Sequence, residues 1–140
     1  MQQVRELAPV SDAVTDGFRV EVVCKYSEEN SSPHEGKWVF QYTVRITNLG
    51  AETARLVSRH WIITDGTMEE PSQTREVKGP GVVGEQPLIS AGETYQYSSW
   101  SPLTMPYGTM HGTYQMVSAS GRQFEIEIAP FGLKARYVVN

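Results

Sequence analysis

Apolar and polar residues alternate along several short stretches of the chain, which is the pattern of β-strands that bury one face. The clearest stretch is residues 38–46, where five large apolar side chains fall at every second position. Residues 18–26 and 124–128 alternate in the same way, and residues 54–64 are rich in β-branched and aromatic side chains. No window of eleven or more residues has the apolar spacing of an amphipathic helix.

The pattern predicts an all-β chain of seven or eight short strands. We expect an antiparallel β-sandwich of two sheets packed face to face, as in immunoglobulin and fibronectin type III domains. Residues 1–16 are interpreted as a flexible lead-in, residues 17–133 as the sandwich, and residues 134–140 as a tail or an added edge strand. Residues 27–36 and 101–110 are rich in turn-forming types and are expected to be loops.

Composition limits the function. The net charge is −4 and the basic residues are scattered, which disfavours nucleic-acid binding because that needs clustered lysine and arginine. The single cysteine, Cys24, rules out an internal disulfide and a cysteine-based zinc cluster within one chain, and its alternation with Val22 and Tyr26 predicts a buried thiol. No signal peptide and no membrane-spanning run is recognisable, so we expect a cytoplasmic protein without membrane insertion.

Residues 78–87 hold three of the twelve glycines and two of the eight prolines. Gly79, Gly81 and Gly84 have the G-x-G-x-x-G spacing of dinucleotide-binding loops, which need a helix that opens at the loop to hold the pyrophosphate. Pro87 follows instead, so the spacing favours a loop whose glycines permit positive φ or close backbone approach. An alternative is a small anion or nucleotide pyrophosphate held by loop amides, with Lys78 as charge. The candidate ligand or partner residues of this glycine loop (residues 79–87) are Gly79, Gly81, Gly84, Glu85 and Gln86.

No catalytic or cofactor site is predicted. His34, His60 and His111 lack the close spacing of paired metal ligands, and His60 is interpreted as a structural histidine. Ser58, two residues before His60, lacks the strand–turn–helix context of a hydrolase nucleophile. We therefore expect neither an enzyme nor a resident metal.

Several long motifs resemble the ApaG family, in the right order from about residue 17 to about residue 133. They are SRHWIITD at 58–65, GPGVVGEQP at 79–87, AGE at 91–93, GTMHGTYQM at 108–116 and FEIEIAPF at 124–131. The resemblance implies a fibronectin type III or immunoglobulin-type sandwich. It also implies a link to cobalt resistance and magnesium efflux, as in bacterial members, without an agreed biochemical activity. In eukaryotic relatives, among them F-box proteins and a DNA-polymerase-delta-interacting protein, the domain is taken to mediate protein contacts. Residues 68–74 and 98–100 depart from the family pattern.

The apolar side chains between residues 100 and 107 are unusually large for a solvated loop. They either close the end of the sandwich or form an exposed recognition patch. The candidate recognition surface is Arg59, on a strand face expected to be exposed, with Trp100, Leu103, Met105 and Tyr107.

The sequence thus predicts a non-catalytic interaction module that docks an unidentified protein through the glycine loop and residues 100–107. The alternative is a small-anion or nucleotide-binding protein that uses the glycine loop. A third hypothesis, a metal-handling protein, requires His60 or His111 to converge with Asp65 or Glu85.

Overall fold

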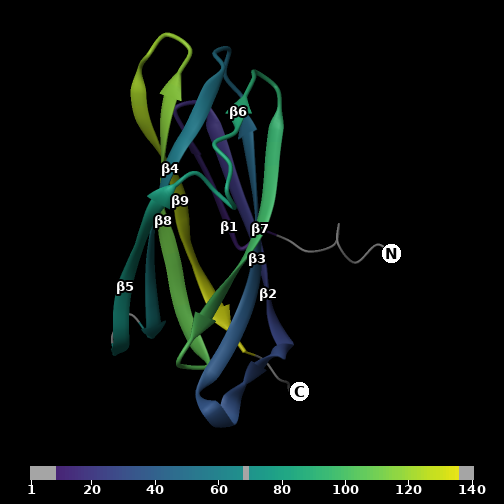
Figure 1. The fold of residues 1–140 in the computed structure, drawn as a ribbon, viewed down its shortest axis with the longest axis vertical. Coiled ribbons are helices and arrows are strands. Elements are labelled where there is room, and N and C mark those ends of the chain that lie inside the picture. Colours follow the sequence, from purple (N-terminus) through teal and green to yellow (C-terminus); the bar gives the residue numbers. More distant parts are fainter. Residues whose placement is uncertain (1–8, 68–69, 136–140) are drawn as a thin grey trace.

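The computed structural model describes residues 9–67 and 70–135, in which nine strands and one short 3₁₀ turn form the regular structure (Figure 1). The elements are β1 (Ser11–Thr15), β2 (Phe18–Ser32), η1 (Pro33–Glu35), β3 (Lys37–Asn48), β4 (Ala54–Gly66), β5 (Pro71–Pro80), β6 (Leu88–Ile89), β7 (Thr94–Leu103), β8 (Tyr107–Ser118) and β9 (Gln123–Lys134). Within the part of the chain that the structure describes, no helix is long and apolar enough to span a membrane.

The strands form two antiparallel sheets. One has the order β1-β2-β3-β7, and the other has the order β5-β4-β8-β9 with β6 also paired to β4. The two sheets form separate layers in Figure 1, which confirms the predicted all-β sandwich. The strand count exceeds the prediction because β1 and β6 are short and carry little pattern of their own.

Alternation along β3 builds the centre of the core. Phe40, Tyr42, Val44 and Ile46 are buried, and they face apolar side chains of the opposite sheet. The Tyr42 ring meets the ring of Trp61 on β4 edge-on, with centroids 5.3 Å apart. Such aromatic pairs add roughly 1 kcal/mol to the hydrophobic gain from burial.

The predicted lead-in is wrong for residues 11–15, which form β1. Asp16 and Gly17 both have positive φ, 51° and 80°, and form a two-residue hairpin turn between Thr15 and Phe18. Aspartate and glycine favour such turns because both adopt the left-handed region at low cost. Residues 1–8 of the lead-in, and the edge strand expected at the C-terminal end, lie outside the described residues, apart from residues 134 and 135.

The two predicted loops are also largely strand. β2 continues to Ser32 through an irregular register, and β7 continues to Leu103, so that residues 104–106 alone separate it from β8. Pro102 fits in β7 because its position needs no amide hydrogen. Val39, the residue opposite Pro102, donates its own N–H away from β7, to the hydroxyl of Ser31.

Candidate functional site

The glycine loop follows the edge of β4. Beyond Pro80 it continues beside β4, since the Gly81 amide donates to the carbonyl of Val57 at 2.8 Å. It rejoins the same edge at Pro87, whose carbonyl accepts from the Leu56 amide at 3.0 Å. The β4–β8 register shifts between residues 56 and 58, and this irregularity frees the Val57 carbonyl for the loop.

Residues 82–85 form a tight turn at the middle of the loop, here called the loop turn. Val82 and Glu85 exchange two backbone hydrogen bonds, both of 2.8 Å, and the intervening Val83 and Gly84 have φ of 40° and 82°. Two successive positive φ values are the mark of a type I′ turn. Val82 is buried in the core, whereas the side chain of Val83 is 55% exposed. The loop turn is therefore anchored at one end and presents an apolar residue in a strained conformation to solvent.

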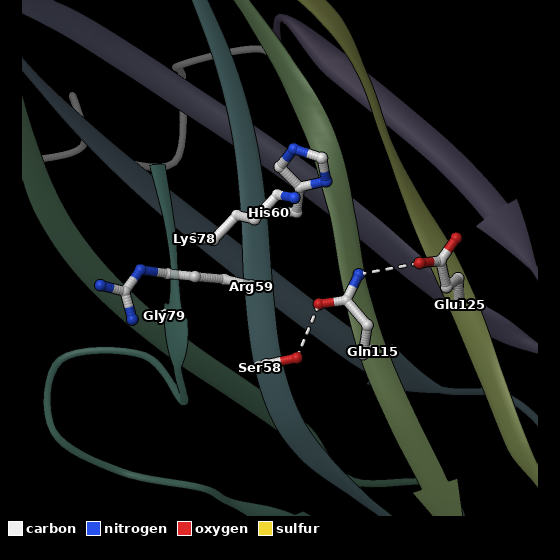
Figure 2. Close-up of a pocket in the computed structure, with 7 residues that line it drawn as sticks. All are labelled: Ser58, Arg59, His60, Lys78, Gly79, Gln115 and Glu125. Atoms are coloured by element: carbon white, nitrogen blue, oxygen red, sulfur yellow. Dashed lines mark hydrogen bonds between the residues drawn. The ribbon is translucent and has the colours of Figure 1, made fainter. Parts of the chain in front are cut away.

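Arg59 holds the loop from beneath. Its Nη1 donates to the carbonyls of Pro80 at 2.9 Å and Gly81 at 2.8 Å. Its guanidinium lies against Gly79, where a Cβ would come within 2.9 Å of it. Figure 2 shows Arg59 reaching toward Gly79, away from Ser58. Arg59 is half-buried and does not lie on the exposed strand face that the sequence predicted, because its strand position has the inward parity of the buried Trp61.

Part of the backbone of the glycine loop is already hydrogen-bonded within the protein. The amides of Gly81, Val82 and Glu85 donate to protein carbonyls, and the carbonyls of residues 80 and 81 face Arg59. A backbone nest for an anion needs several free amides that converge. The side chains of two candidate residues also brace the loop: Gln86 donates to the Val57 carbonyl at 2.8 Å, and Glu85 accepts from the Tyr95 hydroxyl at 3.2 Å.

The glycines serve the backbone of this loop. Gly81 has φ of 59°, and a Cβ on it would collide with the carbonyl oxygen of Glu85. Gly84 completes the type I′ turn, and Gly79 leaves room for the guanidinium of Arg59. The G-x-G-x-x-G spacing is thus explained by positive φ and close approach, as one interpretation of the sequence expected.

Two buried tyrosines link the sheets near Arg59. The hydroxyls of Tyr97 on β7 and Tyr114 on β8 lie 2.5 Å apart. Burial raises the pKa of both phenols well above their usual value, and it also raises the pKa of Tyr42. Neutral tyrosines in this position satisfy each other's hydroxyls and fix the spacing between the two sheets.

The candidate recognition residues do not form one surface. Trp100 is 50% exposed on the outer face of β7, where it is paired with Gln41, whereas Tyr107 begins β8 in the other sheet and pairs with Lys134. Leu103 is buried and shares the inward parity of Tyr97 along β7, so it fits the alternative in which these side chains close the sandwich and does not belong to the candidate recognition surface. Met105, in the short connection to β8, is half-buried.

A shallow hollow lies over the outer face of β4 and β8 (Figure 2). The Ser58 hydroxyl donates to Oε1 of Gln115 at 2.7 Å, and Gln115 donates to Glu125 at 3.0 Å. His60 is not part of this chain of hydrogen bonds, since its Nε2 pairs with Oε1 of Glu76 at 2.9 Å. An amide cannot act as a general base, so the geometry does not activate Ser58 as a nucleophile.

Asp65, a possible metal ligand in the sequence, is fully buried and accepts hydrogen bonds from neighbouring side chains and backbone. Thr104 donates through its amide at 2.9 Å and its hydroxyl at 2.6 Å, and Arg75 donates at 3.2 Å. Residues 9–67 and 70–135 contain no group of three or more histidine, cysteine, aspartate or glutamate side chains that could hold a metal ion.

Sequence reasoning missed the three features that shape this region: the strained Val83, the pair Tyr97–Tyr114 and the buried Asp65. The tyrosine pair could have been suspected from the inward parity of Tyr97. No signal in the sequence points to Val83, because type I′ turns prefer asparagine or aspartate at that position.

Comparison with known proteins places the chain in a family. Residues 28–118 match the family model described as the ApaG domain. Protein ApaG of Shewanella baltica is 50% identical over 121 residues, which cover 86% of this chain and 93% of the relative. Protein ApaG of Bordetella pertussis is 53% identical over 112 residues, which cover 80% of this chain and 82% of the relative.

Solved structures agree with this family assignment. The crystal structure of an ApaA protein from Bordetella pertussis superposes with a TM-score of 0.78 at 51% identity, covering 84% of this chain and 92% of that one. The C-terminal domain of wzt shares the fold alone, with a TM-score of 0.54 at 7% identity over 95% of this chain and 82% of that one. From the family model and these relatives, the chain belongs to the ApaG family.

Proposed function

We propose that this chain is a non-catalytic docking module that binds a protein partner through the loop turn. The observation that carries the proposal is Val83, an exposed β-branched residue held at positive φ. A left-handed conformation costs an L-residue about 1–2 kcal/mol. Such strain persists only where the surroundings over-determine it, and it gathers at functional sites.

The rest of the loop supports this interpretation. Val82 anchors the turn in the core, and Arg59 and Gln86 fix its two flanks by hydrogen bonds. A rigid apolar tip loses little conformational entropy on binding, which is the requirement for an anchor residue in a protein interface. The amides of Gly81, Val82 and Glu85 already donate hydrogen bonds within the protein, which supports a protein ligand over a small anion.

The test compares two valines of similar exposure. Val83→Asn replaces the apolar tip by a residue that the turn prefers, and Val14→Asn makes the same chemical change on β1, where the side chain is 59% exposed. Each folded variant is immobilised beside the wild type and exposed to native extract. We expect a protein retained by the wild type and by Val14→Asn to be lost by Val83→Asn. Retention of the same proteins by all three would overturn the proposal.

The wild-type protein also tests the alternative function, a small-anion or nucleotide site at the glycine loop. Isothermal titration with pyrophosphate, ATP, cobalt and magnesium should give no binding heat with the wild type. Saturable heat with pyrophosphate or ATP that disappears in a Lys78→Ala variant would instead favour an anion site at the glycine loop, which begins next to Lys78.

A further inference from the structure

The two sheets have edge strands on two sides of the sandwich, β1 and β9 on one side and β7 and β5 on the other. The edges of β1 and β9 are covered. The two edge strands there bind each other through side chains: the Ser11 hydroxyl donates to the Ala129 carbonyl at 2.6 Å, and the Glu127 amide donates to the Thr15 hydroxyl at 3.2 Å. Groups that would otherwise be free to pair with another chain are therefore occupied.

The edge strand β5, on the opposite side, is protected by its sequence. Arg75, Glu76 and Lys78 place charges along it, and a proline stands at each end. Charges and prolines on an edge are the usual obstacles to pairing with a further strand.

The edge strand β7 lacks these obstacles over most of its length. It runs for ten residues, TYQYSSWSPL, without a charged side chain, and its pairing to β3 is regular from Thr94 to Leu103. One end is blocked, because Pro102 has no amide hydrogen and its carbonyl accepts from Arg75 at 2.6 Å. The rest of the strand has no proline, bulge or charge.

The backbone groups of Gln96, Ser98 and Trp100 face outward from this edge. Alternate residues of an antiparallel strand turn both backbone groups toward the same neighbour. The carbonyl of Pro102 faces away from β3, since it binds Arg75, and these three residues share its parity. Their side chains lie on the outer face, where all three are exposed.

We propose that β7 pairs antiparallel with β7 of a second copy of this chain, joining the four-stranded sheets of the two copies into one. The uncharged edge favours this occupant, because two-fold pairing sets Gln96, Ser98 and Trp100 against the same residues of the other copy and brings no like charges together. The contact is confined to one strand of each copy, so the association is weak and transient. Each copy carries a net charge of −4, so salt strengthens the dimer by screening their repulsion.

The test uses charge at Ser98. Ser98→Lys places like charges near each other across the paired strands, and Ser98→Glu does the same with the opposite sign. The matched control is Thr43→Lys, on the same face but one strand further from the edge. It removes the same 2.7 Å hydrogen bond, because the Thr43 and Ser98 hydroxyls bind each other. Sedimentation equilibrium of the full chain measures self-association up to millimolar concentration, and thermal melts check that each variant is folded.

We expect the wild type and Thr43→Lys to have the same dimer dissociation constant, and each Ser98 variant to have a constant that is higher by at least roughly fivefold. An equimolar mixture of Ser98→Lys and Ser98→Glu should associate again, because opposite charges then meet. The lysine variant lowers the net negative charge, so its weaker association cannot come from overall repulsion. The proposal is overturned by a wild type that stays monomeric, by equal loss in Thr43→Lys, or by a mixture that remains monomeric.

Discussion

Replacing Val83 by asparagine should stabilise the protein, although it removes an apolar side chain. Val83 occupies the first central position of a type I′ turn with φ of 40°, and Gly84 occupies the second. Asn-Gly is the preferred pair at these positions, because asparagine adopts the left-handed region with little strain. Val83→Asn therefore keeps the backbone of the loop turn and changes the residue to one that suits it.

The expected gain is a difference between two terms. Relief of the left-handed conformation contributes about 1–2 kcal/mol. Val83 is 55% exposed, so the lost burial is slightly less than half of the roughly 1.5 kcal/mol for a fully buried valine. The net stabilisation is about 0.5–1 kcal/mol, which for a domain of this size raises Tm by roughly 2–3 °C.

Urea denaturation and thermal melting measure this change, with two variants as controls. Val83→Ala keeps a Cβ at positive φ and loses apolar contact, so it should fall below the wild type. Val14→Asn puts asparagine into the regular strand β1, where it is expected to cost about 0.5–1 kcal/mol. A destabilised Val83→Asn, or equal effects of asparagine at both sites, would refute the argument that strain is stored in the loop turn.

Three further predictions concern buried groups. Burial raises the pKa of Tyr97 and Tyr114 above the usual value of about 10. The stability that the two neutral phenols contribute is therefore complete below that pH, and above it the free energy of unfolding falls by about 1.4 kcal/mol per pH unit for each tyrosine. The double variant Tyr97→Phe/Tyr114→Phe should reduce this loss of stability at alkaline pH. Asp65→Ala should lower the free energy of unfolding in urea by about 3–5 kcal/mol, because it leaves the partly buried Arg75 without its counter-charge. Almost no change in stability would contradict the burial of this ion pair. Burial raises the pKa of Cys24 from 9.0 to about 11, so iodoacetamide should react roughly 100-fold more slowly with the folded chain than with the chain in urea at pH 8, and equal rates would contradict the burial.

The alternation of apolar and polar residues was sufficient to predict the strands that bury one face against the core. β3 alternates from Phe40 to Ile46 and β9 from Phe124 to Ile128, and these inward residues are those that the sequence indicated, with Trp38 and Phe124 at the margin of the core. Beyond Ile128 the β8–β9 register shifts, and Phe131 and Leu133 are buried on the opposite parity. The edge strand β1 was not predicted, because its pairing depends on tertiary contacts. β1 is held by β2 and β9, and its one sequence signal is the hairpin pair Asp16-Gly17. Pro102 suggested a loop, but an edge position of β7 needs no amide hydrogen there.

The candidate site was less predictable than the fold. The sequence identified the glycine loop, but the φ angle of Val83 follows from how the loop is anchored at Val57 and Val82, which lie at separate places in the chain. Leu103 was misplaced because its surroundings suggested a loop, where side-chain direction has no period. Once β7 is extended through it, its parity makes it a core residue.

Arg59 connects these features and permits a sharper test of the strained turn. Its bonds to the carbonyls of Pro80 and Gly81 hold the backbone that leads into Val83, so strain at Val83 depends on them. In an Arg59→Met background the loop can relax, and Val83→Asn should then stabilise less than it does in the wild type. A double-mutant cycle by urea denaturation should give a coupling of about 0.5–1 kcal/mol between the two positions. The same cycle with Val14→Asn should be additive, because Val14 lies on β1 and has no part in the loop. If Val83→Asn gave the same gain with and without the guanidinium, the strain would be a local property of the turn, and Arg59 would not be the residue that maintains it.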